Sequence, residues 1–212
     1  MENMPEDRTI MSVKTLVQKY ESNRKHYLSN RYNESQLRTD FLEPLFELMG
    51  WDIKNVAGRA TNEREVLVEE PLKENVSANT KKPDYTFRLF DTRKFFLEAK
   101  KPNVKIHENP VSARQIRAYG FTAKLKICAL SNFEYLAIYD CSKQVGINDI
   151  ASHSRINLYH YTEYVDKFEE IKKQLGQESV YSGLFDDIWK DIEEQLKLFS
   201  IDKLFLEQIN RW

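Results

Sequence analysis

The stretch KPDYTFRL at residues 82–89, followed by FFLEAK at residues 95–100, decides the fold of this chain. Apolar and polar side chains alternate in both segments, which predicts two strands joined by a tight connection near residues 91–92. Residues directly opposite each other in an antiparallel pair point to the same face. If the connection has an odd number of loop residues, Asp84 faces Glu98, with Lys100 on the same face. The opposite, core-facing side would then hold Tyr85, Phe87, Leu89, Phe95, Leu97 and Ala99.

Two carboxylates that meet across a sheet repel each other by roughly 4 kcal/mol at 4 Å and an effective dielectric constant near 20. Lys100 supplies one compensating charge, and a hard divalent cation compensates better, because Mg²⁺ prefers oxygen ligands. Such a metal activates water and stabilises charge on a phosphate. The alternative is that Asp84 starts an edge strand and that Glu98 and Lys100 form a weak surface pair.

The rest of the chain predicts an α/β fold with a central mixed sheet flanked by helices. We expect helices at residues 12–28, 33–50, 110–122 and 163–175, and strands at 66–68, 126–130, 135–139 and 156–161. Asn33 and Gln36 resemble a capping box, Pro44 should kink or loosen the second helix, and Gly50 should end it. An apolar stripe predicts an acidic, helical C-terminal extension that packs as a separate unit; its residues are Phe185, Ile188, Trp189, Ile192, Leu196 and Phe199. The apolar pattern continues to Trp212, so we expect the chain to be a fragment of a longer protein.

Composition narrows the class of protein. The 212 residues suit about one domain, the two cysteines suit reduced thiols, and the four histidines show no metal-binding spacing. We find no export signal and no apolar run long enough to cross a bilayer, so we expect a cytoplasmic protein. The net charge is −1, but residues 81–126 hold twelve basic against four acidic residues. This segregation favours a polyanion partner at the centre of the chain, although solvated strand edges and helix faces would also explain it.

Several motifs together resemble a known family. Pro83-Asp84 with Glu98-Ala99-Lys100 matches the PD-(D/E)XK nuclease motif, and Gln115 with Tyr119 fits a QxxxY signature of these nucleases. The segment from Glu34 to Asp52 is similar to the N-terminal nuclease domain of fused restriction-modification enzymes (type IIG) and of type I restriction motor subunits. The resemblance covers roughly residues 33–140.

The resemblance implies a restriction-endonuclease-like core and a set of site residues. Asp84, Glu98 and the Ala99 carbonyl would bind Mg²⁺, with Mn²⁺ as a substitute, while Lys100 would serve the attacking water. Glu34 would complete the site, although the helix dipole alone favours an acid there. Gln115 and Tyr119 would hold Lys100 or contact DNA, unless they are ordinary packing. The basic residues that would neutralise DNA phosphates are Lys81, Lys82, Lys101, Arg114 and Arg117.

The expected organisation is an N-terminal helical segment (1–31), a nuclease core (32–176) and a helical connector (177–212). The expected partner is double-stranded DNA. Methyltransferase and target-recognition regions would lie elsewhere on the same full-length chain, and S-adenosylmethionine would bind only through that methyltransferase. This sequence contains no methyltransferase motif and no helicase P-loop, GxxxxGK[ST]. The rival interpretation is a catalytically inactive nuclease fold that serves in DNA binding or assembly.

Overall fold

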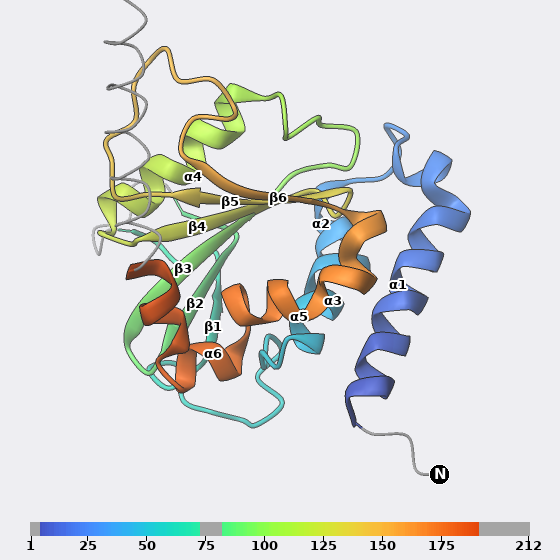
Figure 1. The fold of residues 1–212 in the computed structure, drawn as a ribbon, viewed down its shortest axis with the longest axis horizontal. Helices are drawn as coiled ribbons and strands as arrows, with labels where there is room; N and C mark the ends of the chain where they lie inside the picture. The colour runs from blue at the N-terminus through green and yellow to red at the C-terminus, as the bar shows by residue number, and fades with distance from the viewer. Residues whose placement is uncertain (1–4, 73–81, 191–212) are drawn as a thin grey trace, which may run out of the picture.

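A six-stranded mixed sheet forms the centre of the computed structural model, which describes residues 5–72 and 82–190 (Figure 1). The strands lie in chain order and are β1 (Val66–Val68), β2 (Tyr85–Leu89), β3 (Thr92–Ala99), β4 (Ile127–Ser131), β5 (Tyr135–Asp140) and β6 (Arg155–His160). Neighbouring strands are antiparallel except for β3 and β4, which are parallel. A parallel pair requires a crossover, which here contains one helix. The predicted α/β class with a mixed sheet is confirmed.

The helices cover both faces of this sheet. They are α1 (Pro5–Tyr27), α2 (Glu34–Leu37), the π-helical turn η1 (Arg38–Leu42), α3 (Glu43–Leu48), α4 (Pro110–Thr122), the 3-10 turn η2 (Tyr161–Glu163), α5 (Tyr164–Leu175) and α6 (Gln177–Tyr181). In Figure 1, α4 lies on one side of the sheet, and α1, α3, α5 and α6 lie on the other. The strands therefore need apolar residues on both faces.

Two hydrophobic clusters result from this arrangement. The larger one includes every residue that the alternation assigned to the core-facing side, with Leu89 partly buried at its edge. On the opposite face Phe96 is fully buried in a second cluster beneath α4, together with Ile116. The face of the hairpin that carries Glu98 is therefore covered by a helix and is not a solvated surface.

The segment from Glu34 to Leu48 is helical throughout but changes from α-helix to π-helix and back to α-helix. Asn33 and Gln36 form the predicted capping box, with reciprocal hydrogen bonds of 2.8 and 3.0 Å. Pro44 lacks an N–H donor, and the turn before it widens to the π form at η1. Gly50 adopts a φ of 98°, which a residue with a side chain rarely adopts, and the helix ends there as predicted.

The first part of the C-terminal extension is helical, as predicted, but it does not pack as a separate unit. Residues 184–190 are helical, and Phe185 and Trp189 are each only 2% exposed within the larger cluster. The Trp189 indole donates a hydrogen bond to the Gln174 carbonyl. The sequence pattern showed an apolar stripe without showing what it packs against. The rest of the predicted stripe, from Ile192 onward, lies outside the described residues.

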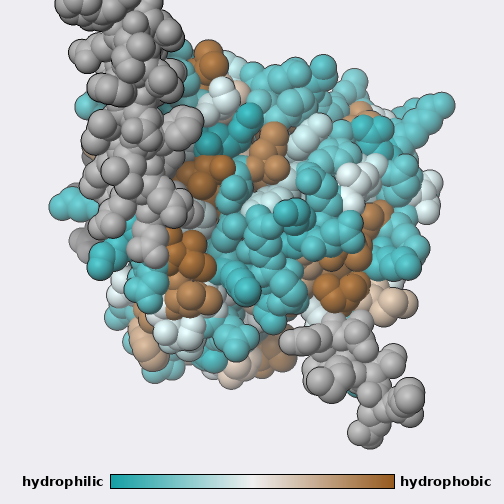
Figure 2. Space-filling view, viewed as in Figure 1, coloured by the Kyte–Doolittle hydropathy of each residue, from teal (hydrophilic) through white to brown (hydrophobic). Residues whose placement is uncertain are grey.

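The face drawn in Figure 2 is largely hydrophilic, with small and separate hydrophobic patches. No helix within residues 5–72 and 82–190 is long and apolar enough to cross a membrane.

Gly120 of α4 allows this helix to approach the sheet closely. A Cβ atom at this position would lie 2.6 Å from the sulfur atoms of both Cys128 and Cys141. We therefore expect Gly120→Ala to destabilise the protein by about 1–3 kcal/mol, because overpacking outweighs the roughly 1 kcal/mol gain in helix propensity. Urea unfolding measures this, with Ala118→Gly as a control for propensity alone in the same helix. A more stable Gly120→Ala protein would contradict the close packing.

Candidate active site

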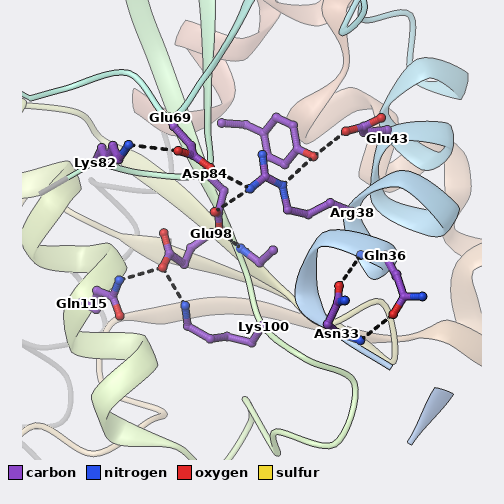
Figure 3. A network of polar contacts seen from close by, with 12 residues as sticks. Asn33, Gln36, Arg38, Glu43, Glu69, Lys82, Asp84, Glu98, Lys100 and Gln115 are labelled. Atoms are coloured by element: carbon purple, nitrogen blue, oxygen red, sulfur yellow. Dashed lines mark hydrogen bonds and ion pairs between the residues drawn. The ribbon is translucent and has the colours of Figure 1, made fainter. Parts of the chain in front are cut away.

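The β2–β3 hairpin brings Asp84 and Glu98 together at one end of the sheet. Tyr85 pairs with Leu97, so one further step along the antiparallel register places Asp84 opposite Glu98. The Asp84 carboxylate accepts a 2.7 Å hydrogen bond from the Ala99 backbone N–H. Figure 3 shows both carboxylates on neighbouring strands, with Lys100 reaching back toward Glu98. The predicted arrangement of the three side chains is present, but the expected odd number of loop residues is not. The connection has two residues between Leu89 and Thr92, and a register shift between Phe87 and Arg88 brings the two carboxylates opposite each other.

Two side chains contact the buried Glu98 carboxylate. The Lys100 ammonium lies 2.6 Å from Glu98 Oε1, and the Gln115 amide donates a 2.7 Å hydrogen bond to the same oxygen. Gln115 also donates to the Tyr119 hydroxyl at 3.0 Å, so α4 contributes a linked pair to the site. The expectation that Gln115 and Tyr119 hold Lys100 needs correction. Gln115 contacts the carboxylate, because the buried face of α4 lies directly over Glu98.

The environment of Glu98 opposes its charge. Burial, and next the charge of Asp84, raise the pKa of Glu98 from its ordinary value of 4.5 to about 7, although Lys100 acts in the opposite direction. Burial also disfavours the charge of Lys100, but the interactions with Glu98 outweigh burial and raise the pKa of Lys100. Lys100 therefore remains a cation at neutral pH and does not act there as a free base.

Asp84 has a cationic partner that the sequence did not reveal. The Arg38 guanidinium lies 3.2 Å from Asp84 and 3.4 Å from Glu69, donates a hydrogen bond to the Tyr85 hydroxyl, and stacks over the Tyr85 ring (Figure 3). The spacing of Arg38 four residues after Glu34 indicates a shared helix face and could have pointed to this role. Glu69 gave no such signal, because its position depends on the pairing of β1 with β2.

Glu34 is the first residue of α2 and is partly buried. Burial raises its pKa, and the nearby charge of Lys100 partly offsets that shift, while Asp84 adds to it. Glu34 is therefore close enough to interact electrostatically with Lys100 and Asp84. No direct contact between Glu34 and either of them is present.

The predicted phosphate-binding residues lie in different surroundings. Lys101 is exposed, whereas Lys82 pairs with Glu69 at 3.0 Å. Arg114 donates to a backbone carbonyl of the 142–154 loop, and Lys81 lies outside the described residues. Arg117 is only 2% exposed and forms a 2.6 Å ion pair with Asp149. Arg117 is therefore not available for the DNA contact predicted from the sequence. The local charge count assumed an exposed side chain, whereas this α4 side chain is buried.

One atom of this cluster lacks a partner. Glu98 Oε2 is buried and accepts no hydrogen bond from the part of the chain that the structure describes. A buried acceptor of this kind costs free energy unless a ligand satisfies it, and a carboxylate oxygen suits a hard cation. Among the residues that the structure describes, no three His, Cys, Asp or Glu side chains are grouped closely enough to hold a metal. A cation bound between the two facing carboxylates would take its remaining ligands from water and the backbone.

Comparisons with known proteins agree with the predicted family. No family model matches the chain. A solved chain in the cryo-EM structure of a DrdV–DNA complex aligns over 79% of this chain and 95% of its own length, with 12% identity and a TM-score of 0.44; this likeness is too weak to establish a shared fold. Over 197 residues, or 93% of the chain, the sequence is 63% identical to the Type II restriction enzyme and methyltransferase RM.Eco57I of Escherichia coli, and it spans 20% of that protein. The chain is therefore a relative of a type II restriction enzyme and methyltransferase, which confirms the restriction-modification family predicted from its motifs.

Proposed function

We propose that this chain is the endonuclease part of a restriction-modification enzyme and hydrolyses phosphodiester bonds of double-stranded DNA with Mg²⁺. The observation that carries the proposal is the buried Glu98 carboxylate. It lies opposite Asp84, is fixed by Lys100 and Gln115, and has one oxygen without a hydrogen-bond partner among the described residues. The arrangement on adjacent strands of one sheet resembles the acid-acid-lysine set of the PD-(D/E)XK motif, which supports the proposal.

Each residue has a distinct task in this proposal. Asp84, Glu98 and the Ala99 carbonyl would hold Mg²⁺, and Mn²⁺ would substitute for it. The ion would supply a polarised scissile phosphate and a water with a lowered pKa. Lys100, which stays charged, orients the attacking water and stabilises the negative charge that develops on the phosphate. Gln115 keeps Glu98 in one orientation, and Glu34 adds a carboxylate at the edge of the site.

The relative suggests the wider setting. It is a restriction enzyme and methyltransferase of which this chain spans one fifth. We infer that methylation, target recognition and S-adenosylmethionine binding belong to other regions of a longer, cytoplasmic protein. A fused type IIG arrangement with its nuclease core at residues 32–176 agrees with this setting better than a type I motor subunit.

A catalytically inactive DNA-binding or assembly module is the competing function. The ion pair between Arg38 and Asp84 favours this alternative, because it neutralises one of the two carboxylates that a metal would need. The two functions differ in how they respond to divalent metal. The inactive module would bind duplex DNA to the same extent with and without Mg²⁺ and would leave the DNA intact.

Cleavage of supercoiled plasmid by the chain, in excess over DNA, tests the proposal. We expect nicked and linear products with Mg²⁺ or Mn²⁺, and none after addition of a chelator. Ca²⁺ at equal ionic strength serves as a control for charge screening. An intact plasmid with both Mg²⁺ and Mn²⁺, together with metal-independent binding, would favour the inactive module.

A further inference from the structure

Several basic side chains between residues 82 and 117 already have partners within the protein. Lys82, Arg93 and Arg117 form ion pairs with carboxylates at 3.0, 2.7 and 2.6 Å. The Arg88 guanidinium donates to backbone carbonyls of the 61–64 segment. A cation that is already paired gains less from a phosphate, because the first partner must be released. The local excess of positive charge is therefore a poor guide to where DNA binds.

Arg31 and Lys101 differ from these residues. Both are exposed, and neither forms an ion pair within residues 5–72 and 82–190. Arg31 belongs to the loop between α1 and α2, and Lys101 to the loop between β3 and α4. Figure 1 places these two loops at the same end of the sheet, and the Asn103 amide donates a 3.2 Å hydrogen bond to the Asn30 side chain, which joins them.

Both loops are held in place. The Asn132 amide donates to the Pro102 and Val104 carbonyls at 3.2 and 2.8 Å, which fixes the first residues of the β3–α4 loop. On the other loop, Tyr32 is buried and donates a 2.9 Å hydrogen bond to Asp40. A cation on a rigid loop loses less conformational entropy when it binds an anion. The two cations are therefore presented on a preorganised surface.

This surface adjoins the carboxylate site. Lys101 directly follows Lys100 in the chain, and Arg31 lies three residues before Glu34. Burial raises the pKa of Glu34, and the charge of Lys101 is among the influences that oppose this rise, which agrees with this placement. The exposed amides of Asn30 and Asn103 lie on the same loops and suit phosphate oxygens, as neutral donors commonly do. Two cations and two amides beside the site match a phosphodiester backbone.

We propose that Arg31, Asn30, Lys101 and Asn103, hereafter the two-loop surface, contact the backbone phosphates of the DNA strand that enters the site. The proposal rests on the proposed nuclease function and names residues that place the substrate. From the basic set inferred from local charge it takes Lys101, and it leaves aside Lys81, which lies outside the described residues. Contacts of this kind carry no sequence information, so the two-loop surface acts on any duplex.

The salt dependence of binding tests the two-loop surface. Binding of the chain to a fluorescein-labelled duplex is followed by anisotropy, with a chelator present so that no cleavage occurs. The slope of log affinity against log salt should fall in magnitude by about 0.9 for Arg31→Ala or Lys101→Ala, and by about 1.8 for the double variant. Lys14→Ala is the matched control, because Lys14 is an exposed lysine in the middle of α1 that forms no ion pair with any residue in 5–72 or 82–190. Its slope should equal that of the wild type.

Unchanged slopes in both single variants would overturn the proposal, and so would an equal loss in Lys14→Ala, which would mean diffuse binding. A stronger preference for duplex RNA than for duplex DNA would also overturn it. These results are distinguishable from failure of the nuclease function. If the chain binds DNA through the two-loop surface but does not cleave it with metal, the proposed nuclease activity is wrong and the two-loop surface stands.

Discussion

Glu98→Gln and Asp84→Asn should each lower the rate of metal-dependent plasmid cleavage by at least about 100-fold. Each change keeps the size of the side chain and removes one negative charge. The amide at position 98 still accepts a hydrogen bond from Lys100, so the local packing remains. What is lost is the pair of facing carboxylates, which leaves too little negative charge to hold a divalent cation beside a phosphate.

Single-turnover cleavage and titration calorimetry with Mn²⁺ measure the two parts of this effect. Metal binding should weaken in parallel with cleavage in both variants. Glu178→Gln is the control, because that carboxylate is 84% exposed on α6 and lies outside the cluster. Cleavage retained by Glu98→Gln at the wild-type rate would exclude Glu98 as a metal ligand.

The stability of the metal-free protein should fall with rising pH because of Glu98. Its pKa is about 7 in the folded state and near 4.5 when unfolded, so the folded state binds the proton more tightly. The carboxyl therefore costs little stability below pH 4.5. Its ionisation becomes progressively unfavourable between about pH 4.5 and 7, and the penalty is constant above that range. Between pH 5 and 8 this one group should remove about 2–3 kcal/mol.

Urea unfolding of wild type and Glu98→Gln at pH 5 and pH 8, with a chelator present, isolates this effect. The amide does not titrate, so the stability of Glu98→Gln relative to wild type should rise by about 2–3 kcal/mol across that interval. Titrating groups that lie too far from Glu98 to interact with it cancel in the comparison. A constant difference between the two proteins would mean that Glu98 titrates near its ordinary pKa and is not desolvated.

The sequence predicted the hairpin well because strand alternation is a local property. The period of two predicted which residues of each strand share a face. The expected loop with an odd number of residues was wrong, because Leu89 pairs with Thr92 across two residues, and a register shift between Phe87 and Arg88 places Asp84 opposite Glu98. The capping box at Asn33 and the helix end at Gly50 were also local signals and were confirmed. Local sequence patterns therefore predicted the helices and strands and the carboxylates that they carry.

The rest of the site depends on contacts between segments that are distant in the chain. Arg38 reaches Asp84 across 46 residues, and Gln115 reaches Glu98 from a separate helix. Arg117 counted as a surface cation in the sequence, but α4 turns it into the second core, where Asp149 neutralises it. Phe185 and Trp189 likewise pack into the larger hydrophobic cluster, which their sequence pattern did not indicate. Such pairings are decided by tertiary packing, for which a single sequence gives no periodic signal.

The π-helical turn at Arg38–Leu42 has a geometric consequence for the site. A regular helix advances by about 100° for each residue, and a π turn accommodates one residue more than an α turn would. The extra residue lets Arg38 point toward Asp84 while Leu45 and Phe46 of the same segment stay buried. Without it, the start of the segment would be rotated by about 100° relative to its end. The widened turn therefore fixes the angle, about the helix axis, between Arg38, which faces Asp84, and the buried residues Leu45 and Phe46.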